Sequence, residues 1–231
     1  MTDALVIGAG PAGLMAAEEL ARAGIKTLVA DAKPSVGRKF LMAGKSGLNL
    51  TKDEPFETFL NAYAEAAPFL RPMLDAFGPE QVATWAQGLD QPVFTGSSNR
   101  VFPTAMKASP LLRAWMTRLT DLGVEFRTKW RWTGWQNEAV QFETPDGPQL
   151  ITPKVTILAL GGASWSRLGS DGAWASLLSD KGIDLAPFAP ANIGLAINWS
   201  HHMSRHFGSP LKSTKLTAGT TSSRGESVIS K

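Results

Sequence analysis

Three glycines and an aspartate near the N-terminus have the residue types and the spacing of a dinucleotide-binding site. Gly8, Gly10 and Gly13 form the pattern G-x-G-x-x-G, and Asp31 follows 18 residues after the third glycine. In this pattern the first glycine permits a tight turn, the second lets the backbone approach a pyrophosphate, and the third lets a helix pack closely on a strand. An acid about 20 residues further on accepts a hydrogen bond from a ribose 2′-hydroxyl, which favours NAD or FAD over a 2′-phosphorylated cofactor.

The glycines can bind phosphate only where a strand leads directly into a helix, and the neighbouring residues predict that arrangement. Residues 4–7 form a short apolar run that stops at glycine, which is typical of a buried parallel strand. Apolar residues then recur at helical spacing over residues 11–23, and Gly24 follows as a helix cap. A second apolar run, residues 25–31, ends on Asp31. This βαβ unit predicts an α/β fold of the Rossmann type with a parallel sheet.

The rest of the chain alternates predicted helices and strands. A helix over residues 56–77 is expected to be broken at Pro68 and Pro72, because proline removes a backbone donor. The wholly apolar run 155–162 is expected in the interior of the sheet. Further helices are predicted over residues 79–88, 108–123 and 172–182, and further strands over residues 91–103, 124–132 and 139–153.

Residues 37–51, GRKFLMAGKSGLNLT, form a glycine-rich and cationic loop soon after Asp31. Its AGKSG segment looks like the end of a P-loop, but a P-loop requires glycine where this chain has Lys39. We therefore expect a loop that flanks the dinucleotide and not a second phosphate site. Arg38, Lys39 and Lys45 could approach the diphosphate, although for Lys45 a solvated loop cation is an equally open alternative.

The composition of the chain excludes several classes of function. Its 231 residues are 43% hydrophobic, and 23 Lys and Arg residues face 20 Asp and Glu residues with no block of like charge. Nucleic-acid binding is therefore not expected, and no membrane span is expected because the longest apolar runs, such as residues 155–163, are too short to cross a bilayer. The absence of cysteine excludes disulfides and thiolate metal sites, and together with the lack of a secretion signal it favours the cytoplasm. No metal site is predicted, because His202 and His206 lack a third ligand nearby.

Four segments together resemble one known family. LVIGAGPAGLMAAEELARAG, GRKFLMAGKSGLNLT, NRVFPTAMKAS and LALGGASWSRLGSDG are similar, in this order, to segments of the BaiN/YhiN-type bacterial flavoproteins. These are FAD-dependent oxidoreductases with a glutathione-reductase-like FAD domain. The resemblance implies FAD as cofactor, NAD(P)H as a candidate reductant and a small organic molecule as substrate.

The resemblance also implies which residues contact FAD, while no catalytic residue is assigned. The expected contacts are Gly8, Gly10, Ala12 and Gly13 under the pyrophosphate; Asp31 on the adenosine ribose; Lys33, Gly37, Arg38 and Lys39 beside the nucleotide; Asn49 and Thr51 further along the cofactor; the strand near Trp132 on the adenine, through its backbone; and Ala159, Gly161 and Gly162 on the ribose-pyrophosphate side.

The chain departs from the family pattern in two places. Many relatives have a Gly-Gly-Arg-Cys run where this chain has residues 45–48, Lys-Ser-Gly-Leu. The family's chains also continue beyond the point where this one ends. We therefore expect residues 1–190 to form the FAD-binding domain and residues 191–231 to begin an incomplete β-rich substrate domain, with the proline-rich residues 184–192 between them.

Two alternatives to an FAD-dependent oxidoreductase remain open at this stage. A truncated chain of this kind could be a non-catalytic dinucleotide-binding fragment that holds the ADP half of FAD only weakly. The glycine pattern and Asp31 would equally suit an NAD-dependent dehydrogenase. Bound flavin would distinguish the oxidoreductase from both.

Overall fold

The computed structural model describes residues 2–43, 47–190 and 194–230. The chain forms two compact units, Met1–Phe188 and Ala189–Lys231. Both the predicted βαβ unit and the cavity described below belong to the first unit.

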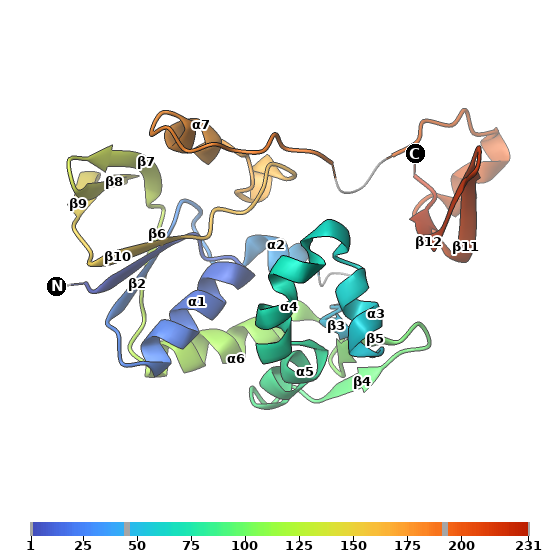
Figure 1. The fold of residues 1–231 in the computed structure, drawn as a ribbon, viewed down its shortest axis with the longest axis horizontal. Coiled ribbons are helices and arrows are strands. Elements are labelled where there is room, and N and C mark those ends of the chain that lie inside the picture. The colour runs from blue at the N-terminus through green and yellow to red at the C-terminus, as the bar shows by residue number, and fades with distance from the viewer. Residues whose placement is uncertain (1, 44–46, 191–193, 231) are drawn as a thin grey trace. The chain divides into compact units, whose positions relative to one another are not determined.

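A four-stranded parallel sheet forms the centre of the first unit (Figure 1). Its order is β10-β1-β2-β6, and each neighbouring pair runs parallel. The predicted α/β fold of the Rossmann type is thus confirmed. The strands are β1 (Ala4–Ile7), β2 (Thr27–Asp31), β6 (Glu125–Thr128) and β10 (Val155–Leu158).

Two helices cover one face of this sheet, α1 (Pro11–Arg22) and α6 (Ala108–Asp121). Val6 and Val29 point from the sheet into this layer, where they join a buried cluster that includes Trp115 of α6. Because side chains alternate between the faces of a strand, the neighbours of these valines enter a different cluster.

A second, antiparallel sheet and a short helix contribute to the buried cluster on the other face. Leu5 and Ile7 pack there with Trp132, Phe142 and Leu178. Both faces of the central strands are therefore covered, which explains why β1 is wholly apolar and β2 is apolar between Thr27 and Asp31. This layer contains β7 (Arg131–Gln136), β8 (Ala139–Thr144) and β9 (Gly147–Ile151), joined in the order β7-β8-β9, and α7 (Trp174–Ser179).

One expectation for the sheet is wrong. The apolar run around β10 was expected in the sheet interior, yet within the described residues β10 pairs only with β1 and is an edge strand. Val155 is 46% exposed and Leu158 is 37% exposed. The apolar composition of a strand does not show how many neighbouring strands it pairs with, which is why the prediction failed.

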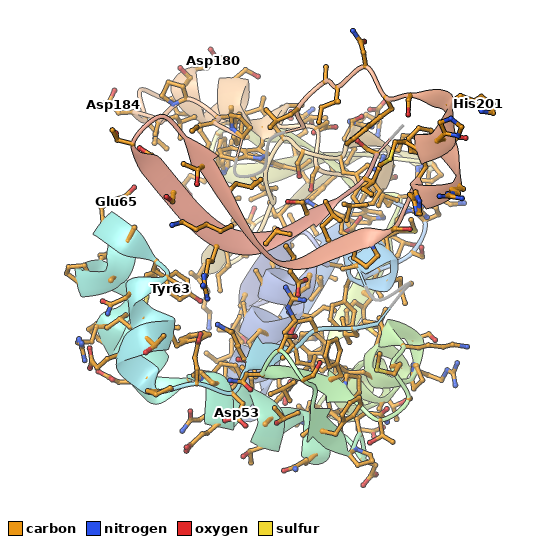
Figure 2. The ribbon with its side chains drawn as sticks, turned by 90° about the vertical axis from the view of Figure 1, so that its right-hand side faces the viewer. Asp53, Tyr63, Glu65, Asp180, Asp184 and His201 are labelled. Carbon is orange, nitrogen blue, oxygen red and sulfur yellow. The ribbon has the colours of Figure 1, made fainter. Side chains whose placement is uncertain are left out.

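Between α2 (Arg38–Ala43) and α6, the chain forms an additional group of helices and short strands. The helical break expected at Pro68 and Pro72 occurs earlier, where the chain around Tyr63 leaves the α-helix and Ala64 has φ 49°. Figure 2 shows Tyr63 and Glu65 on this connection. Pro68 stands in the first turn of α4, where no backbone donor is needed, and α4 continues through Pro72. The elements are β3 (Thr51–Lys52), α3 (Phe56–Asn61), the 3₁₀ helix η1 (Ala64–Ala66), α4 (Ala67–Ala76), α5 (Pro79–Gln87), β4 (Val93–Thr95) and β5 (Arg100–Pro103).

The second unit consists of a 3₁₀ helix and a β-hairpin. The polar, Ser- and Thr-rich C-terminal residues form the antiparallel pair β11 (Pro210–Ala218) and β12 (Thr221–Val228), preceded by η3 (His201–His206). In the part of the chain that the structure describes, no group of three or more His, Asp or Glu side chains is placed to hold a metal. None of the described helices has the length and apolar character needed to cross a membrane.

Candidate dinucleotide site

The G-x-G-x-x-G segment joins β1 to α1. The space around each of its three glycines shows whether the protein itself requires glycine at that position. Gly8 has φ +107°, and a Cβ atom on it would lie 2.3 Å from the carbonyl oxygen of Ala159. A Cβ on Gly13 would lie 1.8 Å from the carbonyl oxygen of Gly8. Gly10 has an ordinary φ of −82°, and a Cβ on it would meet no protein atom within 4 Å. The protein itself therefore needs glycine at positions 8 and 13, whereas Gly10 faces open space.

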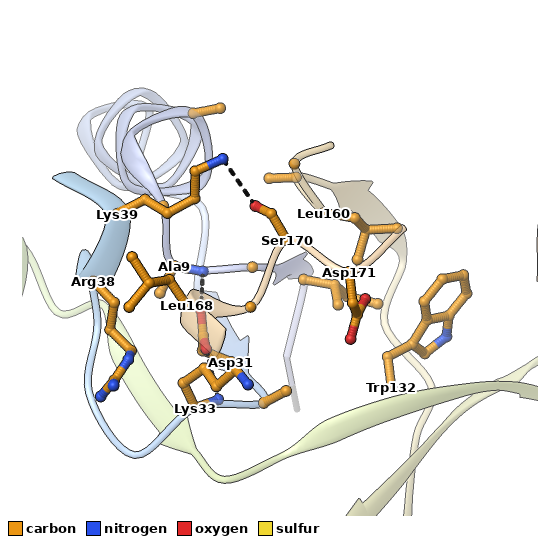
Figure 3. A pocket seen from close by; sticks show the side chains of 18 of the residues that line it. Ala9, Asp31, Lys33, Arg38, Lys39, Trp132, Leu160, Leu168, Ser170 and Asp171 are labelled. Carbon is orange, nitrogen blue, oxygen red and sulfur yellow. Dashed lines mark hydrogen bonds between the residues drawn. The ribbon is translucent and has the colours of Figure 1, made fainter. Parts of the chain in front are cut away.

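Asp31, the last residue of β2, is hydrogen-bonded to this turn. One of its carboxylate oxygens accepts a hydrogen bond from the backbone N–H of Ala9 at 2.7 Å, and the other accepts one from the backbone N–H of Lys33 at 2.7 Å. A carboxylate has about four acceptor positions, so both oxygens can still accept a further hydrogen bond from a ligand hydroxyl. The contact with Ala9 orients the glycine turn toward the carboxyl end of β2 (Figure 3).

Three cations expected beside the nucleotide surround the same space. Lys39 donates hydrogen bonds to the hydroxyls of Ser164 and Ser170, at 3.2 and 3.1 Å. Arg38 donates to Ser35 at 3.3 Å, and its Nε is buried with no hydrogen-bond partner among the described residues. Lys33 donates to the carbonyl oxygen of Ser166 at 3.4 Å. A buried guanidinium donor without a protein acceptor fits an anionic ligand in this place.

The residues after β10 form a strap, defined here as residues 164–171, which borders the site opposite α2 (Figure 3). The strap contains the 3₁₀ helix η2 (Ser166–Leu168) and is closed on itself by a β-bridge between Trp165 and Ser170. Its Ser170 is 5% exposed and bonds to Lys39. The strap and α2 are thus joined across 131 positions of sequence.

A cavity of about 470 Å³ lies at the carboxyl ends of the parallel strands and is lined by these segments. Its volume is within the range of roughly 300–1,000 Å³ that small-molecule sites usually have. Its position, beyond the carboxyl ends of an open parallel sheet, is where ligands bind in such folds. The predicted site residues that line it are Gly8, Gly10, Ala12, Asp31, Lys33, Gly37, Arg38, Lys39, Trp132, Ala159 and Gly161.

The remaining predicted residues lie outside the cavity wall. Gly13 supports the turn from behind, and Gly162 follows the lining residue Gly161 without lining the cavity itself. Asn49 and Thr51 are also absent from the wall, and Thr51 pairs with Val101 in the small β3-β5-β4 sheet. Lys45 and its neighbours, residues 44–46, lie outside the described residues. Part of the expected loop, residues 38–43, is in fact the short helix α2.

Several lining residues could not be predicted because they belong to no sequence motif. The strap contributes Leu168, Ser170 and Asp171, and Trp174 follows at the start of α7. Figure 3 shows Asp171 between Leu160 and Trp132. The LALGGASWSRLGSDG segment could have pointed to the strap through its resemblance to relatives, but no spacing rule identifies these side chains individually.

Comparison with known proteins assigns the family. The HI0933-like protein Rossmann domain matches residues 2–224, which is most of the chain. The chain belongs to this family. The resemblance to BaiN/YhiN-type flavoproteins found in the sequence is thereby confirmed.

Two individual proteins are similar over part of their length. The 3-dehydro-bile acid delta(4,6)-reductase of Clostridium scindens is 27% identical over 201 residues, covering 83% of this chain and 47% of the reductase. The solved structure of 3-ketosteroid-delta4-(5alpha)-dehydrogenase from Rhodococcus jostii RHA1 superposes with a TM-score of 0.50 at 15% identity, covering 69% of this chain and 46% of the dehydrogenase. The structural match shows a shared fold. The chain spans about half the length of each of these proteins.

Proposed function

We propose that this chain binds FAD through the cavity of its first unit and provides the nucleotide-binding part of an FAD-dependent oxidoreductase. The main observation in support of the proposal is the open space in front of Gly10. Neither its backbone angle nor a neighbouring atom requires glycine there, and the missing side chain opens directly onto the cavity. A phosphate that approaches the backbone closely is the simplest reason for glycine at such a position.

The other residues of the cavity fit the ADP part of FAD. The N-terminus of α1 offers backbone N–H groups and a partial positive charge to the pyrophosphate, and Arg38 and Lys39 add full positive charges. Asp31 is placed to accept a hydrogen bond from a ribose hydroxyl. The aromatic wall that includes Trp132 suits a planar base. Bound flavin would supply the hydride or electron transfer, while these residues bind and orient it.

The proposal extends to the second unit and to the reaction partners. We propose that Ala189–Lys231 belongs to a β-rich substrate domain, that the reductant is NAD(P)H and that the substrate is a small organic molecule. The first named relative is a reductase of a bile acid derivative, which supports a reductive reaction on such a molecule. We also propose a cytoplasmic location, which agrees with the absence of cysteine.

Flavin titration tests the proposal directly. The purified chain is expected to bind FAD with saturation, to acquire a flavin absorbance spectrum, and to lose the flavin absorbance when NAD(P)H is added. FMN, which lacks the adenosine part, is the matched control and should bind much more weakly. Binding of NAD without any binding of FAD would identify an NAD-dependent dehydrogenase and overturn the proposal.

A further inference from the structure

One half of the cavity presents mainly carbon atoms to a ligand. Trp132 donates its indole N–H to the carbonyl oxygen of Gly134 at 2.9 Å, and Trp174 donates its indole N–H to the carbonyl oxygen of Gly161 at 3.1 Å. Both polar atoms are therefore used within the protein. What remains for a ligand is the apolar surface of the two rings, which suits the faces of a heteroaromatic base.

A single carboxylate stands in this apolar half. Asp31 and Asp171 are the acidic residues among the described residues that line the cavity, and Asp31 is hydrogen-bonded to the glycine turn. Figure 3 shows the side chain of Asp171 directed into the hollow between Leu160 and Trp132. The other charged side chain of this wall, Arg131, can only donate hydrogen bonds.

The position of the Asp171 carboxylate is held by its own turn. One carboxylate oxygen accepts a hydrogen bond from the backbone N–H of Ala173 at 3.1 Å, and the other has no protein partner among the described residues. The following Gly172 has φ +71°, and a Cβ on it would lie 2.8 Å from the Cβ of Ala163. The backbone at Gly172 is thus closely packed. The second carboxylate oxygen of Asp171 remains as a free acceptor for a ligand in the cavity.

We propose that Asp171 is a specificity-determining residue that reads the base, accepting a hydrogen bond from the exocyclic amino group of adenine. This inference rests on the proposed binding of the ADP part of FAD. Adenine carries an amino donor at C6, whereas hypoxanthine carries a carbonyl oxygen at the same place. A carboxylate attracts the donor and repels the carbonyl oxygen, so Asp171 selects adenine by both an attractive and a repulsive contact.

The test compares the affinities of the 231-residue chain for ADP and for inosine diphosphate by isothermal titration calorimetry. These two ligands differ only in the base, and neither contains a flavin. The unmodified chain should bind ADP at least about tenfold more tightly than inosine diphosphate, because the contact involves a charged acceptor. In Asp171→Asn the side-chain amide can donate as well as accept, so ADP should bind more weakly, inosine diphosphate more tightly, and the preference should fall to about twofold or less.

Asp180→Asn is the matched control. Asp180 lies at the end of α7, is exposed, and does not line the cavity. Figure 2 shows it at the surface of the molecule. This variant removes the same charge from the same region and should keep the full preference for ADP.

The outcomes separate this inference from the function on which it rests. If Asp171→Asn binds both ligands but keeps the preference of the unmodified chain, or weakens both ligands equally, Asp171 does not read the base and the inference is wrong. If the unmodified chain binds neither ADP nor FAD, the proposed function and this inference both fail. Restoration of the ADP preference in Asp171→Glu, where a carboxylate is present again, would support the inference further.

Discussion

The three glycines of the turn illustrate how residues of one type serve different purposes. Positions 8 and 13 need glycine because a backbone carbonyl group lies against each of them, that of Ala159 against Gly8 and that of Gly8 against Gly13, and Gly8 also has a positive φ. At position 10 the protein itself tolerates a side chain, and only the proposed pyrophosphate would exclude one. The roles of Gly8 and Gly13 can therefore be tested on the free protein, while that of Gly10 appears only when nucleotide is added.

Substitution at Gly10 should accordingly affect mainly nucleotide binding, and substitution at Gly13 mainly stability. Gly10→Ala is expected to lower the free energy of unfolding by no more than about 1 kcal/mol, the cost of alanine at the N-cap of α1, but to weaken ADP and FAD binding at least about tenfold. Gly13→Ala should destabilise the fold by about 3 kcal/mol or more, because its Cβ would overlap the carbonyl oxygen of Gly8. Urea unfolding measures the free energy of unfolding, and isothermal titration calorimetry measures the affinity for ADP and FAD. Normal nucleotide affinity in Gly10→Ala would contradict a pyrophosphate at this turn.

At the scale of the elements, one buried carboxylate is hydrogen-bonded to residues of three helices of the first unit. Glu18 of α1 is 1% exposed and accepts hydrogen bonds from Arg22, from Trp115 and Arg118 of α6, and from Trp85 of α5. Burial alone would raise its pKa, but the hydrogen bonds from the two arginines and the two tryptophans together outweigh burial and lower the pKa of Glu18 below its ordinary value. The layer on this face of the sheet is thus held by a charge as well as by apolar packing.

The lowered pKa of Glu18 predicts a dependence of stability on pH. Because the folded pKa lies below the unfolded one, Glu18 stabilises the fold fully above its unfolded pKa of about 4.5 and loses this contribution as the pH falls through the folded value. Glu18→Gln should lower the free energy of unfolding at pH 7 by about 3 kcal/mol, and much less at low pH. Urea unfolding between pH 7 and pH 3 measures the difference. Glu19→Gln, on the exposed neighbour, should cost little at any pH.

The strap and the glycine turn differ in how far the sequence could predict them. The turn, α1 and β2 could be predicted because their pattern is local, with an apolar period, a cap and an acid at a set distance. The contacts of Lys39 with Ser164 and Ser170 span more than 120 residues and depend on the path of an irregular segment, which no periodicity describes. For the same reason Asp171 and Trp174 could not be assigned to the site, and the edge position of β10 was missed.

Loss of the Lys39 contacts should loosen the strap. Arg167 is exposed within the strap and offers a cleavage site for trypsin. Lys39→Met removes the donor to both serine hydroxyls, so cleavage after Arg167 should become severalfold faster than in the unmodified chain. Mass spectrometry of the fragments over time measures the rate. Lys26→Met, on an exposed lysine outside the cavity wall, is the control, and equal cleavage rates in all three chains would show that Lys39 does not hold the strap.

At the scale of the whole molecule, the apolar core is distributed unevenly between the two units. Both buried clusters, one on each face of the parallel sheet, consist entirely of residues from Met1–Phe188. Ala189–Lys231 forms a two-stranded hairpin with a short 3₁₀ helix, and Ile229 is its buried apolar residue among those described. A two-stranded hairpin is at best marginally stable by itself, whereas a sheet with two covered faces is a complete folding unit.

The first unit should therefore fold and bind nucleotide without the second. A chain of residues 1–188 is expected to unfold in one cooperative transition with a Tm within about 5 °C of that of the full chain, and to bind ADP with an affinity within about threefold. The cavity lining ends at Leu177, so the shortened chain keeps every residue of the wall. A chain of residues 1–152 lacks β10, the strap and α7, and should show neither a cooperative transition nor ADP binding. If residues 1–188 fold normally but bind ADP much more weakly than the full chain, the nucleotide site includes residues of Ala189–Lys231 and is not confined to the first unit.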